Sequence, residues 1–143
     1  MIANSQAPFP IRLKRVLALL LIFVALYMGL MAVGVVLMRR AIADAKMRTT
    51  RFYQARQGGN WDVPDTRFAT TMKKELAAHE EINGLPTRFE IKHAFAQILG
   101  RPAHCEVDVV RGGQKFRETL SFNGDYCFHF SSSELKAGLA DVN

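Results

Sequence analysis

Two cysteines and two histidines are the side chains of this 143-residue chain best suited to bind a metal or form a disulfide. His104 and Cys105 are adjacent in the sequence, and Cys127 and His129 are two residues apart. In a small exported domain, two cysteines are commonly joined as a disulfide. Thiolate and imidazole groups also bind zinc or copper, although the familiar C-x-x-C spacing is missing. The sequence leaves three states open: a Cys105–Cys127 disulfide, two unbridged thiols, or a metal site drawn from these four side chains.

The expected strand register restrains both kinds of site. A hairpin places Cys105 opposite Leu120, and a two-residue turn at Asn123-Gly124 places Cys127 opposite Leu120 from the other side. Two strand spacings then separate the cysteines by about 9.5 Å, whereas bridged Cα atoms lie at roughly 4.4–6.8 Å. A three-residue turn instead moves Cys127 to the other face of the sheet. On strands, His104 and Cys105 point to opposite faces, whereas Cys127 and His129 share one.

Catalytic groups are sparse elsewhere. His79 is flanked by Glu80 and Glu81, but neighbouring side chains diverge on a helix. His93 falls at the edge of an apolar stripe, where a structural role is expected. No serine has a nucleophile-elbow context, and no glycine-rich phosphate loop is present. We therefore expect neither an enzyme nor a bound cofactor.

One apolar segment, residues 16–38, contains no charge and no proline. As a helix it extends about 34 Å, enough to cross a hydrocarbon core of about 30 Å. It is too long for a secretory signal and lacks a small-residue cleavage site. The sequence predicts a mobile tail over residues 1–10 and an uncleaved transmembrane anchor helix over 11–38. The absence of ionisable groups argues against a proton-driven motor or transporter subunit.

Basic side chains follow this segment. Residues 39–56 carry six basic side chains and only Asp44 as an acid, whereas residues 57–143 carry ten basic and twelve acidic side chains. With no glycine or proline before Gly58-Gly59, the helix is expected to continue as a juxtamembrane stalk over residues 39–59. We expect anionic lipid headgroups to contact its basic side chains: Arg39, Arg40, Lys46, Arg48 and Arg51. A nucleic-acid partner is not expected, because the domain offers no basic face with interleaved aromatic residues.

The anchor also carries small residues on one stripe, Ala25, Gly29 and Ala32, which suits close contact with another helix. Its orientation has two conflicting indications. The larger count of basic residues after the span favours a cytoplasmic domain. The short basic tail before it (Arg12, Lys14, Arg15) is usual for an anchor that exports its C-terminal domain. We expect the exported orientation, with the cytoplasmic side left open.

Two amphipathic helices are expected at the start of the soluble domain, residues 60–143. The first covers residues 65–82, with Phe68, Met72 and Leu76 on one face and Asn83-Gly84 as its stop. The second begins at a capping box of Thr87 and Glu90. Its apolar stripe comprises Ile91, Phe95, Ile98 and Leu99.

Alternation of apolar and polar residues then predicts strands. A two-residue turn at Gly112-Gly113 pairs Cys105 with Leu120 and Asp108 with Arg117. The same register places Val109 opposite Phe116 and Val107 opposite Glu118. A third strand over residues 126–130 follows, and a capping box of Ser131 and Glu134 opens a short C-terminal helix. The predicted fold is α+β: anchor, stalk, two helices, a three-stranded antiparallel meander and a last helix.

This layout is shared by pilus and secretion-machine assembly components and by respiratory accessory subunits. A processed pilin is disfavoured, because the prepilin cleavage glycine and the following glutamate are missing. We expect a non-enzymatic accessory or assembly subunit of a membrane or envelope complex. The alternative is a membrane-tethered metal or redox carrier using Cys105, Cys127, His104 and His129. A small tethered enzyme has the least support.

Overall fold

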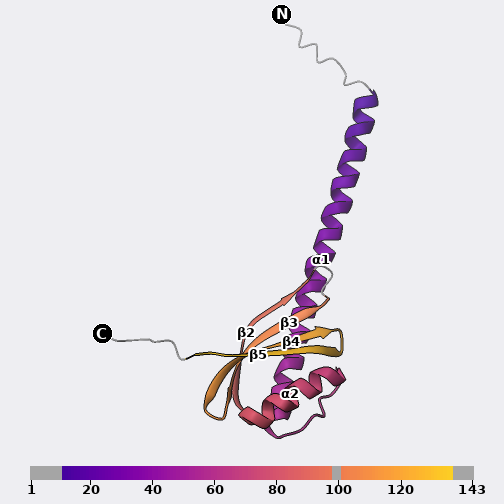
Figure 1. The fold of residues 1–143 in the computed structure, drawn as a ribbon. Coiled ribbons are helices and arrows are strands. Elements are labelled where there is room, and N and C mark those ends of the chain that lie inside the picture. Colours follow the sequence, from indigo (N-terminus) through magenta and orange to yellow (C-terminus); the bar gives the residue numbers. More distant parts are fainter. Residues whose placement is uncertain (1–10, 98–100, 137–143) are drawn as a thin grey trace, which may run out of the picture.

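A long helix projects from a small domain built on one sheet (Figure 1). The computed structural model describes residues 11–97 and 101–136. Its elements are α1 (Ile11–Gln57), β1 (Arg67–Phe68), α2 (Thr70–Asn83), β2 (Pro86–Ala96), β3 (Ala103–Arg111), β4 (Gln114–Asn123) and β5 (Tyr126–Glu134). The five strands lie in the order β1-β5-β4-β3-β2. The sheet is mixed, because β1 runs parallel to β5 and the other neighbours are antiparallel. The predicted three-stranded antiparallel meander is therefore wrong, because β1 and β2 also belong to the sheet.

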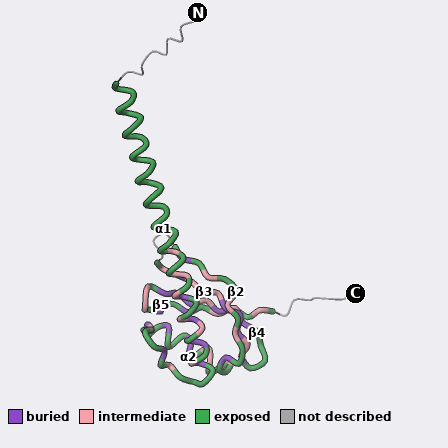
Figure 2. The backbone as a smooth tube through the Cα atoms, turned by 180° about the vertical axis from the view of Figure 1, so that it is seen from behind, coloured by how far each residue is buried: buried purple, intermediate pink, exposed green. Residues whose placement is uncertain are grey.

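The 47-residue helix α1 has two parts with different surroundings. Its N-terminal part is long and apolar enough to cross a membrane, and none of the most apolar window is buried by the rest of the chain. Its C-terminal part is buried at Ala45, Thr49, Phe52, Tyr53 and Arg56. Figure 2 shows this change along a single helix, exposed first and then packed against the sheet. The C-terminal turns of the predicted stalk, residues 39–59, thus pack into the domain core.

The hairpin of β3 and β4 has the predicted register. Val109 lies opposite Phe116, Val107 opposite Glu118 and Cys105 opposite Leu120. Gly112 and Gly113 adopt φ values of 52° and 82°, as a two-residue turn of this type requires. On the outer face, Arg117 Nε donates to Asp108 Oδ1 at 2.9 Å. The opposite-charge pair predicted across these strands is confirmed.

The helix predicted from Thr87 onward is wrong. Residues 86–96 form β2, which pairs antiparallel with β3 and carries an irregularity between Ile91 and His93. Phe89, Ile91 and Ala94 pack against the core and Ala96 is part of it, so their spacing is two, three and two residues. A strand interrupted in this way imitates helical spacing. Two residues of the predicted stripe, Ile98 and Leu99, lie outside the described residues.

The predicted C-terminal helix does not begin at Ser131. Residues 131–134 continue β5, and Ser131 and Glu134 lie opposite Thr119 and Phe116 of β4. The backbone there is extended and bonded to a neighbouring strand, so the two side chains do not cap a helix. Leu139, the last apolar residue of that prediction, lies outside the described residues.

The first soluble helix is present but starts later than predicted. Its N-cap residue is Ala69 rather than Asp65, and Phe68 belongs to β1. Met72 and Leu76 are buried as expected.

Both helices cover the same face of the sheet. The C-terminal part of α1 contacts β2 and β3, while α2 contacts β5. Between them lies the apolar core, whose members include Phe52, Met72, Leu76, Val107, Val109, Leu120 and Phe130. The other face of the sheet carries polar side chains and is not covered by a described helix. The domain is thus a two-layer α+β structure with one inner and one outer sheet face.

Candidate functional site

A buried polar cluster joins α1, α2 and the sheet. We call it the junction network, and it consists of Tyr53, Arg56, His79, Glu80, Arg111 and Glu118. Tyr53 and Arg56 come from α1, His79 and Glu80 from α2, Arg111 from β3 and Glu118 from β4. The side chains of Arg111 and Glu118 have no exposed surface.

Glu118 is the centre of this network. Its Oε2 accepts a hydrogen bond from the Tyr53 hydroxyl at 2.7 Å. Arg111 donates to both carboxylate oxygens, from Nε to Oε1 at 2.6 Å and from Nη2 to Oε2 at 3.0 Å. Burial, together with the nearby negative charge of Glu118, raises the pKa of Tyr53 well above its usual value. Tyr53 therefore remains a neutral donor over the physiological pH range.

A second carboxylate, Glu80, links the two arginines. Arg56 donates to Glu80 through both Nε and Nη2, and Arg111 Nη1 lies 3.2 Å from Glu80 Oε1. The two guanidinium groups also donate to the carbonyl oxygens of Gly59 and Gly84. Two arginines thus balance two glutamates, as buried charges require.

His79 completes the network on the side of α2. Its Nε2 lies 3.3 Å from Glu118 Oε1 and 3.3 Å from the Ser132 hydroxyl. Burial lowers the pKa of this histidine, although Glu118 acts in the opposite direction. An imidazole, a carboxylate and a phenol are groups that general acid–base catalysis uses. Here Glu118 and Arg111 are sealed from solvent, so the arrangement fits a structural joint better than a catalytic centre.

Sequence reasoning missed most of this network, although two signals pointed to it. The buried residues of α1 recur with helical spacing from Ala45 to Arg56, which marks a core-facing stripe. The predicted hairpin register also placed Glu118 on an otherwise apolar face. A charge at such a position requires a buried partner, and Arg111, three residues before β4, is that partner.

The two cysteines are buried free thiols on the inner face of the sheet. Cys105 lies opposite Leu120 as predicted, but Cys127 lies opposite Phe122, which neither of the two turns considered above produces. Burial raises the pKa of Cys105 and raises the pKa of Cys127 to about 12. Because the thiolate is the nucleophile and the metal ligand, both groups are held in their unreactive form.

The four candidate metal ligands are divided between the two faces of the sheet. His104 points outward, where its Nδ1 lies 2.8 Å from the Ser121 hydroxyl. The register shift beside Phe122 leaves Phe128 without a partner residue in β4 and brings His129 opposite Ser121, so Cys127 and His129 do not share a face as expected. Within residues 11–97 and 101–136, no three His, Cys, Asp or Glu side chains gather as a metal site requires.

The basic residues that follow the apolar segment differ in their surroundings. Arg39, Arg40, Lys46 and Arg51 are exposed. Arg48 turns into the domain, where its Nε lies 2.7 Å from Asp44 Oδ2 and its Nη1 lies 3.2 Å from the Thr66 hydroxyl. Four of the five predicted headgroup contacts therefore keep an open side chain.

The predicted helix-contact stripe is open as well. Ala25, Gly29 and Ala32 are exposed on α1, and a side chain added at Gly29 would meet no atom within 4 Å. Within the described residues, neither the apolar part of α1 nor the outer face of the sheet is covered by another helix or strand. Comparison with known proteins identifies no relative, since no family model, curated protein or solved structure matches the chain.

Proposed function

We propose that this protein is a single-span accessory or assembly subunit of a membrane protein complex. It acts without catalysis, through protein–protein contacts of its apolar helix and its small domain. The observation that carries the proposal is the continuity of α1, which runs from an exposed apolar segment into the buried core of the domain.

A continuous helix does what a flexible linker cannot. Each residue of an α-helix adds 1.5 Å of rise and about 100° of rotation, so the helix fixes both the height and the direction of the sheet relative to the bilayer. The junction network and Arg48 then hold α1 against the other elements of the domain. Such a joint suits a subunit that presents one surface to a partner in the same complex.

The proposed orientation places the domain on the exported side. It rests on the short basic tail with Arg12, Lys14 and Arg15 before the span. A cysteine introduced at exposed Glu81 reports the side directly, because the native cysteines are buried. Labelling of Glu81→Cys by a membrane-impermeant maleimide in intact cells supports export, and labelling only after lysis contradicts it.

Rigid positioning is tested by breaking the helix between anchor and domain. A Gly-Ser-Gly-Ser insertion between Arg39 and Arg40 uncouples the two, and the same insertion before Ile11 is the matched control. We expect partners that co-purify with the wild-type chain in mild detergent to be lost with the first insertion and kept with the control. Native Trp61 fluorescence in both variants shows that the domain remains folded.

Two results contradict the proposal. One is a wild-type chain that leaves mild detergent as a lone, stable monomer with no crosslinked neighbour in native membranes. The other is a complex that survives the insertion between Arg39 and Arg40 unchanged.

A further inference from the structure

An open pocket of about 240 Å³ lies where α1 leaves its apolar segment and meets the sheet. We call it the boundary pocket. From α1 it is lined by Leu37, Arg40 and Ala41, and from the sheet side by Arg101 and Phe122. None of these residues belongs to the junction network, which lies at the other end of the packed part of α1.

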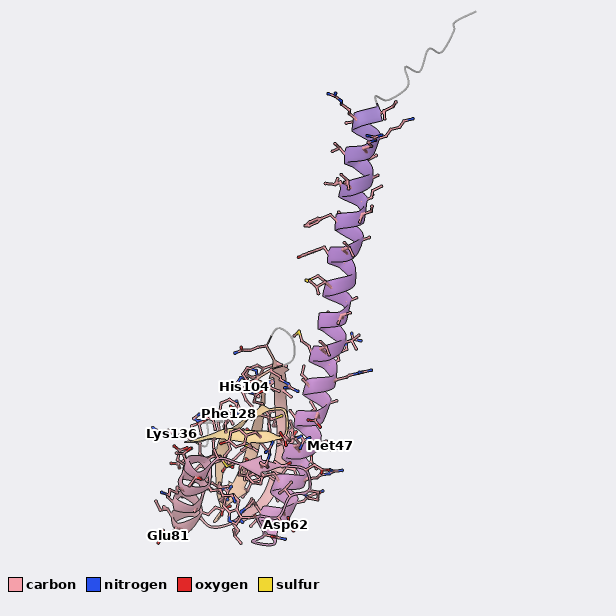
Figure 3. The ribbon with its side chains drawn as sticks, turned by 90° about the vertical axis from the view of Figure 1, so that its right-hand side faces the viewer. Met47, Asp62, Glu81, His104, Phe128 and Lys136 are labelled. Atoms are coloured by element: carbon pink, nitrogen blue, oxygen red, sulfur yellow. The ribbon has the colours of Figure 1, made fainter. Side chains whose placement is uncertain are left out.

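The boundary pocket lies at the level where a bilayer would end. The uncharged segment stops at residue 38, so Leu37 is in its last turn and Arg40 in the first turn beyond it. Figure 3 shows His104 at the end of the domain nearest the apolar part of α1, with Asp62 and Glu81 at the opposite end. With the chain placed in a membrane as proposed above, this pocket faces the lipid headgroups.

The pocket combines two positive charges with an apolar wall. The Arg40 guanidinium group comes from α1, and the Arg101 guanidinium group comes from the connection just before β3. The Arg101 group lies beside Gly124 at the β4–β5 turn, where an added side chain would meet it at 3.7 Å. Asp44 also lines the pocket, but it is paired with Arg48 at 2.7 Å. Among the described residues, the net charge of the lining is therefore positive.

We propose that the boundary pocket binds the phosphate of one anionic phospholipid. Arginine matches phosphate geometry with paired donors, and Leu37 and Phe122 offer an apolar surface to the part of the lipid below the phosphate. Free inorganic phosphate would use the two arginines but not this apolar wall.

An exposed aromatic residue supports the same placement. Phe95, near the end of β2, is 48% exposed and stacks on His104 with ring centroids 4.9 Å apart. β2 ends and β3 begins at this edge, where Ala96 lies opposite Ala103 of the pocket lining. An apolar ring is thus exposed at this end of the domain, and contact with lipid would remove its surface from water.

The test measures lipid binding by the full-length chain in detergent, using native mass spectrometry during titration with phosphatidylglycerol. Phosphatidylcholine and soluble glycerol 3-phosphate are the comparison ligands. The variant Arg40→Gln/Arg101→Gln is matched by Lys74→Gln/Arg88→Gln, which removes two exposed charges that lie outside the pocket and outside the predicted headgroup contacts. A second variant, Ala41→Leu, fills the pocket and leaves its charge unchanged.

We expect one phosphatidylglycerol to bind in preference to phosphatidylcholine. Each pocket arginine removed weakens binding about fivefold, Ala41→Leu also weakens it, and the matched control stays within about twofold of wild type. Equal loss in the control, or unchanged binding in the pocket variants, overturns the pocket. Equal binding of glycerol 3-phosphate overturns the lipid as its ligand.

Alkaline carbonate extraction of membranes that contain the full-length chain separates this inference from the proposed function. If the chain is released, its placement in the membrane fails, and both proposals fail with it. If the chain stays in the membrane while the pocket variants bind lipid normally, only the pocket is overturned.

Discussion

Glu118 offers the sharpest test of the junction network. Its carboxylate has no exposed surface and accepts hydrogen bonds from both Tyr53 and Arg111. The substitution Glu118→Gln keeps the shape of the side chain and removes its charge. Arg56 and Arg111 then share one buried carboxylate, Glu80, so one positive charge is left uncompensated.

The expected loss follows from that imbalance. Removing one partner of a buried ion pair costs about 3–5 kcal/mol, and the amide oxygen of the substituted side chain still accepts one of the hydrogen bonds. We therefore expect Glu118→Gln to lower the free energy of unfolding by about 3 kcal/mol, a large part of the stability of a small domain. The double variant Arg111→Met/Glu118→Leu removes both charges and leaves Arg56 and Glu80 paired. The double variant should lower the free energy of unfolding by at least about 2 kcal/mol less than the summed losses of the single variants Arg111→Met and Glu118→Leu.

Urea unfolding of the full-length protein in detergent micelles measures these values. Trp61 is the only tryptophan, and its ring lies 4.2 Å from the Arg56 guanidinium carbon, so its fluorescence follows the joint. The surface control is Glu90→Gln, which breaks an exposed pair with Lys92 and should cost less than about 1 kcal/mol. A loss for Glu118→Gln no larger than this control, or strictly additive single effects, refutes the account of a charge-balanced joint.

Three further results are expected. In thermal melts, Gly112→Ala should destabilise the fold more than Gly113→Ala. Both glycines have positive φ, but only at Gly112 does an added side chain meet a backbone oxygen, that of Asn83 at 2.9 Å. Equal losses of stability in the two variants would contradict this packing. Burial lowers the pKa of His79 in the folded protein, so below about pH 6.5 the unfolded chain binds more protons than the folded one, and the free energy of unfolding falls as the pH drops. His79→Asn should flatten this pH dependence. An unchanged slope of unfolding free energy against pH would exclude His79 as its source. Finally, Cys127, whose pKa is raised to about 12, should resist iodoacetamide in the native protein and react after urea unfolding, whereas fast native alkylation would show that the thiol is accessible.

The sequence predicted those parts of the fold whose geometry is set locally. The two glycines at 112 and 113 fix a turn, and strict alternation on both sides then leaves only one register for β3 and β4. The Asp108–Arg117 pair agrees with that register. The sequence also predicted that α1 is continuous, because no proline or paired glycine interrupts it before Gly58.

Both major errors occur in strands that contain a register shift. In β2 and β5 the shift changes the spacing of inward side chains from two residues to three, which removes the alternation that identifies a strand. Near each shift, a Thr or Ser three residues before Glu resembled a helix N-terminus. The pairing with β3 and β4 that overrides this local preference is non-local, so a single sequence does not display it.

The candidate site was hidden for a related reason. Tyr53 and Glu118 are 65 positions apart in the sequence, and Arg56 and Glu80 are 24 positions apart. No local sequence motif therefore predicts either contact. Apolar packing alone would allow α1 to settle on the sheet at several nearby rotations, because hydrophobic burial has no direction. Directed hydrogen bonds from α1 and α2 to Glu118 and from Arg56 to Glu80 distinguish among these rotations. The N-terminal part of α1 is long and apolar enough to cross a membrane. In the proposed single-span subunit, fixing that rotation would also fix which side of the domain a neighbouring subunit meets.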